Sequence, residues 1–199
     1  MNRVLVWFGV SVLTVALATS SQAAPVFWSV NGHYYDLVLD SGAPTWYEAK
    51  DSAAAMTYAS LSGYLATVTT KAEQDFLIAS FGGGEAIDSV WVGGYQDTLD
   101  PDYYETDGGW KWITGEPWIT GPDAPVFSFN NTYFDLSSEE YLITWWGTGG
   151  LNDIRDIYGA RGYFVEYEGQ PITVPVPASC LLAGCGALAT VLRRRARHV

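Results

Sequence analysis

The chain has 199 residues, a formal net charge of −12 and only two cysteines. All 22 acidic residues lie between Asp36 and Glu168, and residues 24–170 contain five basic residues, so this segment carries a formal charge of −17. Such a segment is repelled by phosphate backbones, which argues against a nucleic-acid partner. The charge is compatible with cation binding, and equally with an acidic surface that only keeps the protein soluble.

Residues 1–23 have the pattern of a secretory signal peptide. Arg3 gives the positive start, residues 4–18 are almost wholly apolar, and Ser21 and Ala23 are small residues at the positions that signal peptidase reads. We therefore predict cleavage after Ala23 and export of the rest of the chain. A membrane anchor is the alternative, but the apolar run is shorter than the roughly 20 residues that a span requires.

The exported part begins with a predicted β-hairpin. Residues 27–30 and 33–39 read as strands, and Asn31-Gly32 between them suits the two positive-φ positions of a type I′ turn. His33, the single histidine of residues 24–170, falls in the second strand. We expect it to lie on the surface of the hairpin.

Two helices are predicted next, each from a capping box. Thr45 and Glu48 form the first box, and the stripe of Ala49, Ala53, Met56 and Ala59 follows at helical spacing. Thr70 and Glu73 form the second box, which opens a helix that runs to Phe81 and stops at three glycines.

Short strands and long loops make up the remainder, and the whole predicts a single α+β domain with two helices and antiparallel strands. The stretch from Thr114 to Glu139 has no clear periodicity, and a connection of that length is usually functional or disordered. Both cysteines, Cys180 and Cys185, lie in the C-terminal tail, so residues 24–170 must be stable without disulfides. The predicted strands are 63–68, 90–94, 110–113, 141–146 and 163–167.

Taken in order, "TWYEAKDSAAAM", "GYLATVTTKAEQDFL", "VWVGGYQD", "WKWITGEPW", "GGLNDIRD" and "YFVEYE" resemble the motifs of a C-type lectin-like domain. The resemblance spans residues 24–170 and implies that fold. It implies structural roles for Trp91 and Gly93, and a buried strand that contains Trp110 and Trp112. The positions of the family's disulfides are changed here, and fall at Tyr141, Asp156 and Val165.

Asn152 and Asp153 are the candidate functional pair. In the glycine-flanked stretch "GGLNDIRD" they are either turn residues or the hard oxygen ligands that calcium prefers. In calcium-binding members of the lectin family, an Asn-Asp pair and an upstream Glu hold an ion that also binds sugar hydroxyls. The resemblance therefore implies that Glu139, Asn152 and Asp153 are metal ligands and carbohydrate-binding residues.

The fourth ligand is less well marked by the sequence. The family places Glu-Pro-Asn or Gln-Pro-Asp in the long loop, and no such tripeptide stands in register here. By spacing, Asn130 or Asn131 stands nearest to that position, without a preceding proline, and we take Asn131 as the further metal ligand. Glu116-Pro117-Trp118 follows the Trp110–Trp112 strand directly and belongs to an earlier element of the family pattern.

Two functions follow from this reading. The first is an exported carbohydrate-binding module, assisted by Ca²⁺, that binds a glycan or exopolysaccharide. The second is a metal-free structural or adhesive module that uses the same fold to bind another surface protein, because a fold alone does not choose between functions. An enzyme is not expected, since residues 24–170 contain no cysteine, one histidine and no Gly-x-Ser-x-Gly motif.

Residues 171–199 form the predicted sorting tail. Pro171, Pro175 and Pro177 precede an apolar run from Ala178 to Leu192, which ends in a cluster of arginines. This order resembles the PEP-CTERM tails of Gram-negative bacteria, although Val176 stands where that family usually has Glu. The resemblance implies display at the cell envelope or in the extracellular matrix, with membrane contact only through the uncleaved tail. A plain C-terminal anchor is the alternative.

Overall fold

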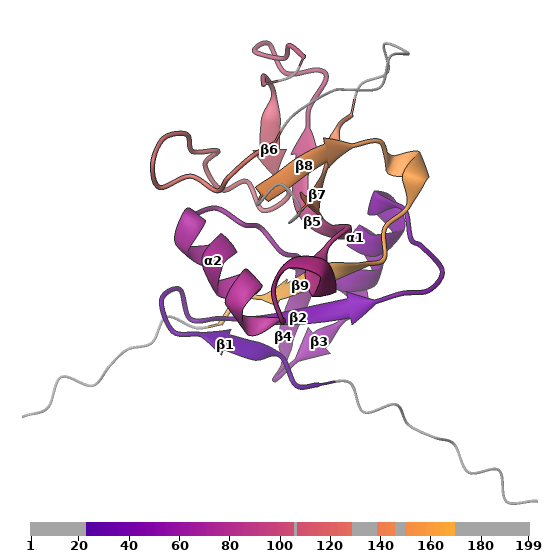
Figure 1. Cartoon of the computed structure of the whole chain (residues 1–199), viewed down its shortest axis with the longest axis vertical. Helices are drawn as coiled ribbons and strands as arrows, with labels where there is room; N and C mark the ends of the chain where they lie inside the picture. Colours follow the sequence, from indigo (N-terminus) through magenta and orange to yellow (C-terminus); the bar gives the residue numbers. More distant parts are fainter. Residues whose placement is uncertain (1–22, 106, 129–138, 146–149, 170–199) are drawn as a thin grey trace, which may run out of the picture.

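The computed structural model describes residues 23–105, 107–128, 139–145 and 150–169 (Figure 1). The helices are α1 (Trp46–Ala55) and α2 (Lys71–Ser80), with single 3-10 turns η1 (Gly84–Ile87) and η2 (Asp156–Tyr158). The strands are β1 (Val26–Trp28), β2 (His33–Leu39), β3 (Thr57–Tyr58), β4 (Leu61–Leu65), β5 (Val90–Gln96), β6 (Trp110–Trp112), β7 (Tyr141–Trp145), β8 (Gly150–Ile154) and β9 (Gly162–Tyr167).

The strands form one mixed sheet in the order β1-β2-β9-β5-β7-β8, with β4 also on β9, β6 on β5, and β3 on β4. Strand β9 pairs along its whole length with β2, while its other edge is shared by β5 and β4. The expectation of antiparallel strands is wrong at one place, because β5 and β9 run parallel. Strand β9, at the end of the domain, thus pairs with β2, at its start. On its other side β9 pairs with β5, and the sheet continues through β7 to β8.

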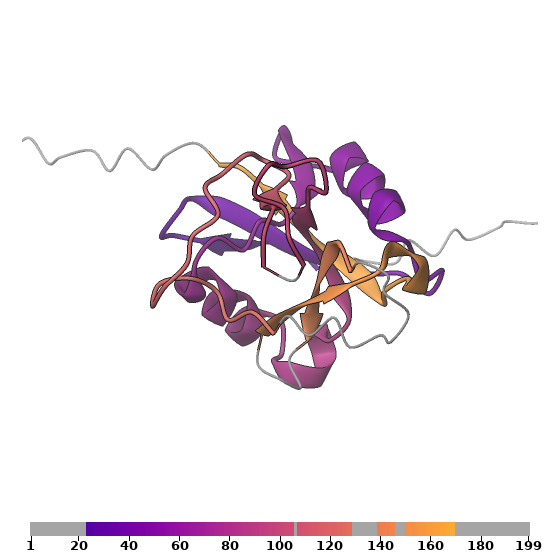
Figure 2. The same ribbon diagram turned by 90° about the horizontal axis from the view of Figure 1, so that it is seen from above.

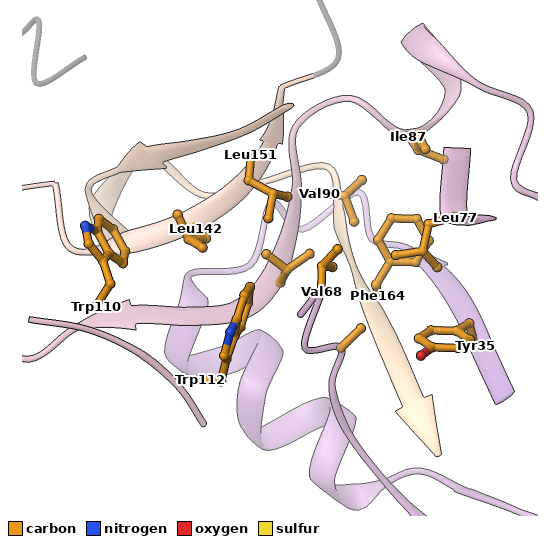
Figure 3. Close-up of a cluster of buried hydrophobic side chains, with 12 residues drawn as sticks. Tyr35, Val68, Leu77, Ile87, Val90, Trp110, Trp112, Leu142, Leu151 and Phe164 are labelled. Carbon is orange, nitrogen blue, oxygen red and sulfur yellow. The ribbon is translucent and has the colours of Figure 1, made fainter. Parts of the chain in front are cut away.

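The core lies on both faces of the sheet, with one helix on each face. Along β9, Phe164 belongs to one buried cluster while Val165 and Tyr167 belong to the other, as the alternation of side chains in a strand requires. Leu77 of α2 packs in the first cluster (Figure 3), and Ala53 of α1 packs in the second. Figure 2 shows the two helices on opposite sides of the central strands.

Both helices begin at the predicted residues, but only one capping box is complete. Thr45 and Glu48 cap each other reciprocally at the start of α1. The Thr70 hydroxyl accepts the Glu73 N–H, whereas the Glu73 carboxylate bonds Thr69 instead of the main chain of Thr70. The predicted stripe of α1 also ends early, because Ala59 has a φ of 49° and lies in the turn between β3 and β4.

The turn of the first hairpin differs from the type I′ prediction. Trp28 pairs with His33, so the connection has four residues, and only Gly32 has a positive φ, at 83°. The Asn31 side chain explains the difference, because its Oδ1 accepts the His33 N–H at 3.0 Å and its Nδ2 donates to the Tyr35 hydroxyl at 2.7 Å. Asn31 therefore closes an Asx-type turn rather than half of a type I′ turn.

The first half of the long connection packs on the sheet. The Trp118 ring stacks on Trp110, with centroids 5.8 Å apart, and on Phe127, with centroids 4.7 Å apart. Phe127 in turn bridges Leu151 of β8. Residues 114–128 thus form a stacked aromatic cover over the Trp110–Trp112 strand, which confirms that this strand is buried.

The altered disulfide positions have new partners along α1. Asp156 Oδ1 accepts the main-chain N–H of Trp46 at 2.5 Å, so this carboxylate caps α1 from a distant part of the chain. The Tyr141 ring packs against Trp46 with centroids 4.8 Å apart, and Val165 is fully buried beside Ala53. Because Cys180 and Cys185 lie outside the described residues, stability without disulfides stays a prediction.

Both predicted targeting segments, residues 1–23 and 171–199, fall almost wholly outside the described residues. Among the residues that are described, neither helix has the length and apolar character to cross a membrane.

Candidate functional site

Of the predicted ligands, Asn152 lies in the middle of β8, Asp153 lies next to its end, and Glu139 lies just before the start of β7. The strands are antiparallel, with Leu142 opposite Asp153 and Ile143 opposite Asn152. Glu139 precedes β7 by two residues, so it lies at the same end of the pair as the end of β8. All three are buried, with exposed fractions of 3%, 5% and 1% in chain order.

The outer edge of β8 is where one ion could meet both Asn152 and Asp153. Neighbouring side chains of a strand leave on opposite faces, so a shared ligand has to sit at the strand edge. The main-chain groups of Leu151 bond Val126 and Ser128 and therefore face away from β7. Main-chain groups alternate along a strand, so the Asp153 carbonyl faces the same outer edge. Asn152 Nδ2 donates to this carbonyl at 2.5 Å, which brings the amide to that edge as well.

The possible metal ligands in this part of the sheet are oxygen atoms. Glu139 and Asp153 contribute carboxylates, Asn152 an amide oxygen, and Asp153 a main-chain carbonyl. No group of three or more His, Cys, Asp or Glu side chains within the described ranges is arranged to hold a metal ion, and the predicted set contains only two residues of these types there. Asn131, the predicted loop ligand, lies outside the described residues.

Glu116 lies elsewhere, as the family pattern implied. Its Oε2 accepts from the hydroxyl of Thr67 at 2.7 Å and from that of Thr114 at 2.8 Å. This places Glu116 on the α2 side of the sheet, beside Glu166, which belongs to a second acidic group.

The second acidic group is a buried network around Tyr35 that sequence reasoning missed. The Tyr35 hydroxyl donates to Glu73 and also lies 3.1 Å from Glu166 Oε1. Glu166 Oε1 is 2.5 Å from His33 Nδ1, and its Oε2 accepts from the Thr67 main-chain N–H at 2.9 Å. His33 is therefore a partner of Glu166 and not a plain surface residue.

Burial controls the protonation of this network. Burial, and then the nearby charge of Glu166, raise the pKa of Glu73 to about 7, against the hydrogen bonds from Tyr35 and Thr69. The hydrogen bond to Glu166 raises the pKa of His33, against the effect of its own burial. Glu73 therefore keeps its proton up to about neutral pH, as suits a buried structural network.

A third feature is an open groove of about 610 Å³ between α1, the end of β5 and the start of β7. Its walls are aromatic, with Tyr47 from α1, Tyr95 from β5 and Tyr141 from β7. The hydroxyls of Tyr47 and Tyr141 are 2.7 Å apart. Lys50 and Glu140 supply a cation and an anion among these rings.

Weak sequence signals pointed to the network around Tyr35 and to the aromatic groove, both of which sequence reasoning missed. In "YFVEYE" the alternation of β9 puts Glu166 on the same face as Phe164, which marks a carboxylate directed into the core. Glu73 was explained by its local role as a capping residue, so its second role, as an acceptor for the Tyr35 hydroxyl, was not predicted. Trp46 and Tyr47 open a helix, where aromatic residues are ordinarily taken as core.

No protein-family model matches the chain. Among curated proteins, halomucin of Haloquadratum walsbyi is 35% identical over 103 residues, a match that covers 52% of this chain and 1% of halomucin. The chain therefore spans about 1% of the length of this relative.

Among solved structures, human lithostathine matches with a TM-score of 0.51 and 18% identity, covering 79% of this chain and 97% of that chain. An EPNH mutant of CEL-I matches with a TM-score of 0.50 and 16% identity, covering 78% of this chain and all of that chain. CEL-I is a C-type lectin from Cucumaria echinata. The chain therefore has the fold of a C-type lectin-like domain. These likenesses establish the fold alone, so the expectation that this protein is not an enzyme stays a prediction.

Proposed function

We propose that this protein is an exported, lectin-like module that binds carbohydrate with the help of Ca²⁺ at the end of the β7–β8 pair. The observation that carries the proposal is that Asn152 and Asp153 lie on the edge strand β8, and that Glu139 lies just before its partner strand β7, in a C-type lectin-like fold. The proposal needs no catalytic group, in keeping with a binding module.

The donor set suits calcium. Ca²⁺ takes six to eight oxygen ligands, from carboxylates, amide and main-chain carbonyls, and water. Glu139, Asn152 and the side chain and carbonyl of Asp153 would supply part of this shell, and Asn131 is the proposed loop ligand.

A calcium ion at a strand edge would also offer positions to a sugar. Two neighbouring hydroxyls can replace two bound waters, since each hydroxyl has lone pairs for the ion and a proton for an acidic ligand. The ion supplies the affinity for vicinal hydroxyls, while the residues of this chain fix its position. An incomplete protein shell favours weak binding, with a dissociation constant for calcium on the order of 10⁻⁴ to 10⁻³ M.

The proposed location is the cell envelope or the extracellular matrix of a Gram-negative bacterium. Support comes from the sequence of residues 1–23 and 171–199 alone, which have the patterns of a signal peptide and a sorting tail. The proposed partner is a glycan or exopolysaccharide outside the cell.

The test is sugar binding with and without calcium. The purified full-length chain is applied to an array of glycans and bacterial polysaccharides, once in calcium and once in EDTA. We expect binding to at least one glycan in calcium and its loss in EDTA. Asp153→Asn keeps the shape of the side chain but removes its charge, and should also abolish this binding.

Asp51→Asn is the matched control, because Asp51 is exposed on α1 and far from β8 in sequence. It should bind as the parent does. Binding that is equal in calcium and in EDTA, and unchanged in Asp153→Asn, would overturn the calcium proposal. Binding only to another surface protein would favour the adhesive module instead.

A further inference from the structure

The aromatic groove beside α1 is separate from the proposed calcium ligands in its chemistry. It is lined by Tyr47, Tyr95 and Tyr141, with Lys50 and Glu140 among the rings and Leu99 at its margin. Its volume of about 610 Å³ falls inside the range of roughly 300–1,000 Å³ that is usual for small-molecule sites. None of the residues proposed to hold calcium lines it.

One ring of the groove is exposed and two others are half-buried. Tyr47 is 51% exposed although it packs edge-to-face against Tyr141, with centroids 5.5 Å apart. Tyr95 and Tyr141 are half-buried, so each is anchored in the fold and still presents a surface. Tyrosine rings held in this way offer a large, rigid apolar surface with a polar hydroxyl at its margin.

The charged side chains of the groove, Lys50 and Glu140, are suited to bind the hydroxyl groups of a ligand. Lys71 and Lys111 form salt bridges with carboxylates, whereas Lys50 forms none with any described residue. Its ammonium instead lies 5.6 Å from the centroid of the Trp46 ring and 5.8 Å from that of Tyr47. An ammonium is a donor only and a carboxylate an acceptor only, so Lys50 and Glu140 together match groups that both accept and donate.

A pyranose ring has this combination of properties. Its C–H face is apolar and stacks on aromatic rings, and its rim carries hydroxyls that each donate and accept. The formal charge of −17 over residues 24–170 repels polyanions, so a neutral sugar is favoured over an acidic one. We propose that this groove is a second, calcium-independent carbohydrate site. It binds neutral hexopyranose units of a polysaccharide, whose C–H face packs against the Tyr47 and Tyr141 rings and whose hydroxyls bond Lys50 and Glu140.

The test is titration of the full-length chain in EDTA with maltohexaose, cellohexaose and mannohexaose, followed by calorimetry or by protein fluorescence. We expect at least one of these to bind in the millimolar range or tighter. Tyr47→Ala should weaken this binding by about tenfold, which corresponds to about 1.4 kcal/mol and lies within the range of an aromatic stacking contact. Tyr47→Phe keeps the ring and should bind within about threefold of the parent.

Matched controls separate the groove from general effects on the surface. Tyr104 is 59% exposed and lies outside the groove, so Tyr104→Ala should bind as the parent does. Lys50→Met should weaken binding, whereas Lys71→Met, which breaks an exposed pair with Asp75, should not. Thermal melting confirms that each variant is folded.

The failure of this proposal is distinguishable from that of the proposed calcium site. No binding of any of the three hexasaccharides in EDTA would overturn it, even if calcium-dependent glycan binding were found. An equal loss of binding in Tyr47→Ala and Tyr104→Ala would overturn it as well. Binding in EDTA that Tyr47→Ala removes and Asp153→Asn leaves intact would establish the groove as a site of its own.

Discussion

The domain contains two buried acidic groups whose surroundings in the structure differ. Under α2, the carboxylates of Glu73 and Glu166 accept hydrogen bonds from hydroxyl and main-chain donors of the same chain. At the end of β8, Asn152 and the main chain of Asp153 bring oxygen donors to the outer edge of the sheet. The comparison teaches that an acidic pair becomes a candidate ion site through its place in the fold, and not through its charge alone.

The largest expected effect is on stability, at the group under α2. Glu166→Ala removes the acceptor for His33, Thr67 and Tyr35 and leaves buried donors without it, so we expect the free energy of unfolding to fall by about 3 kcal/mol. Urea denaturation measures this loss. Glu168→Ala is the control, because Glu168 is exposed just beyond β9. Equal losses in the two variants would mean that the network is not structural.

The pH dependence of stability sharpens the same contrast. The folded-state pKa of Glu73 is raised to about 7 from its ordinary 4.5, so the folded state holds this proton more tightly than the unfolded state does. The stabilisation of the folded state by protonated Glu73 is therefore lost as the pH rises from about 4.5 through 7. His33 also has a raised pKa, and its contribution is present below 6.5 and lost as the pH rises through its folded-state pKa.

Both groups act in one direction, so the free energy of unfolding should fall by about 2 kcal/mol between pH 5 and pH 8. Glu73→Gln removes the larger of the two contributions and should flatten the curve. Melting temperatures measured across this pH range provide the check, with exposed Glu85→Gln as the control. A parent curve that is level, or that rises with pH, would contradict this account of the network.

The group at the end of β8 should respond to calcium instead. At about 5 mM calcium and a dissociation constant on the order of 0.5 mM, binding stabilises the folded state by about 1.4 kcal/mol. Asn152→Ala and Asp153→Asn should abolish this increase, while Glu73→Gln should retain it. Thermal melting in calcium and in EDTA measures the difference. If Glu73→Gln removed the calcium effect and Asp153→Asn did not, the roles of the two groups would be reversed.

Local signals predicted most of the fold. The capping residues Thr45 and Thr70 start their helices where expected, because a cap depends only on residues three positions away. The hairpin turn was predicted wrongly because the Asn31 side chain bonds Tyr35, which lies across the turn. The parallel pairing of β5 with β9 leaves no local signal, since it joins segments about 70 residues apart.

The candidate calcium ligands come from the resemblance to a known family, which selected Glu139, Asn131, Asn152 and Asp153, and their role as ligands stays a prediction. The register of β7 and β8 places Asp153 opposite Leu142 and Asn152 opposite Ile143. The groove could not be predicted, because Tyr47 and Tyr141 come from distant parts of the chain and each reads as core by itself. Tertiary contacts of this kind appear only once the strands are placed.

The smallest expected effect concerns Asp156, a further acidic residue just beyond β8. Its carboxylate accepts the Trp46 main-chain N–H at 2.5 Å, so its role is to cap α1 and not to bind an ion. Asp156→Ala should therefore lower the free energy of unfolding by about 1 kcal/mol, and Asp156→Asn, which keeps an acceptor, by less. Neither variant should change the stabilisation by calcium, measured in the same melting experiment. Loss of the calcium response in Asp156→Asn would instead assign this carboxylate to the ion, and would leave the start of α1 without its long-range cap whenever calcium is bound.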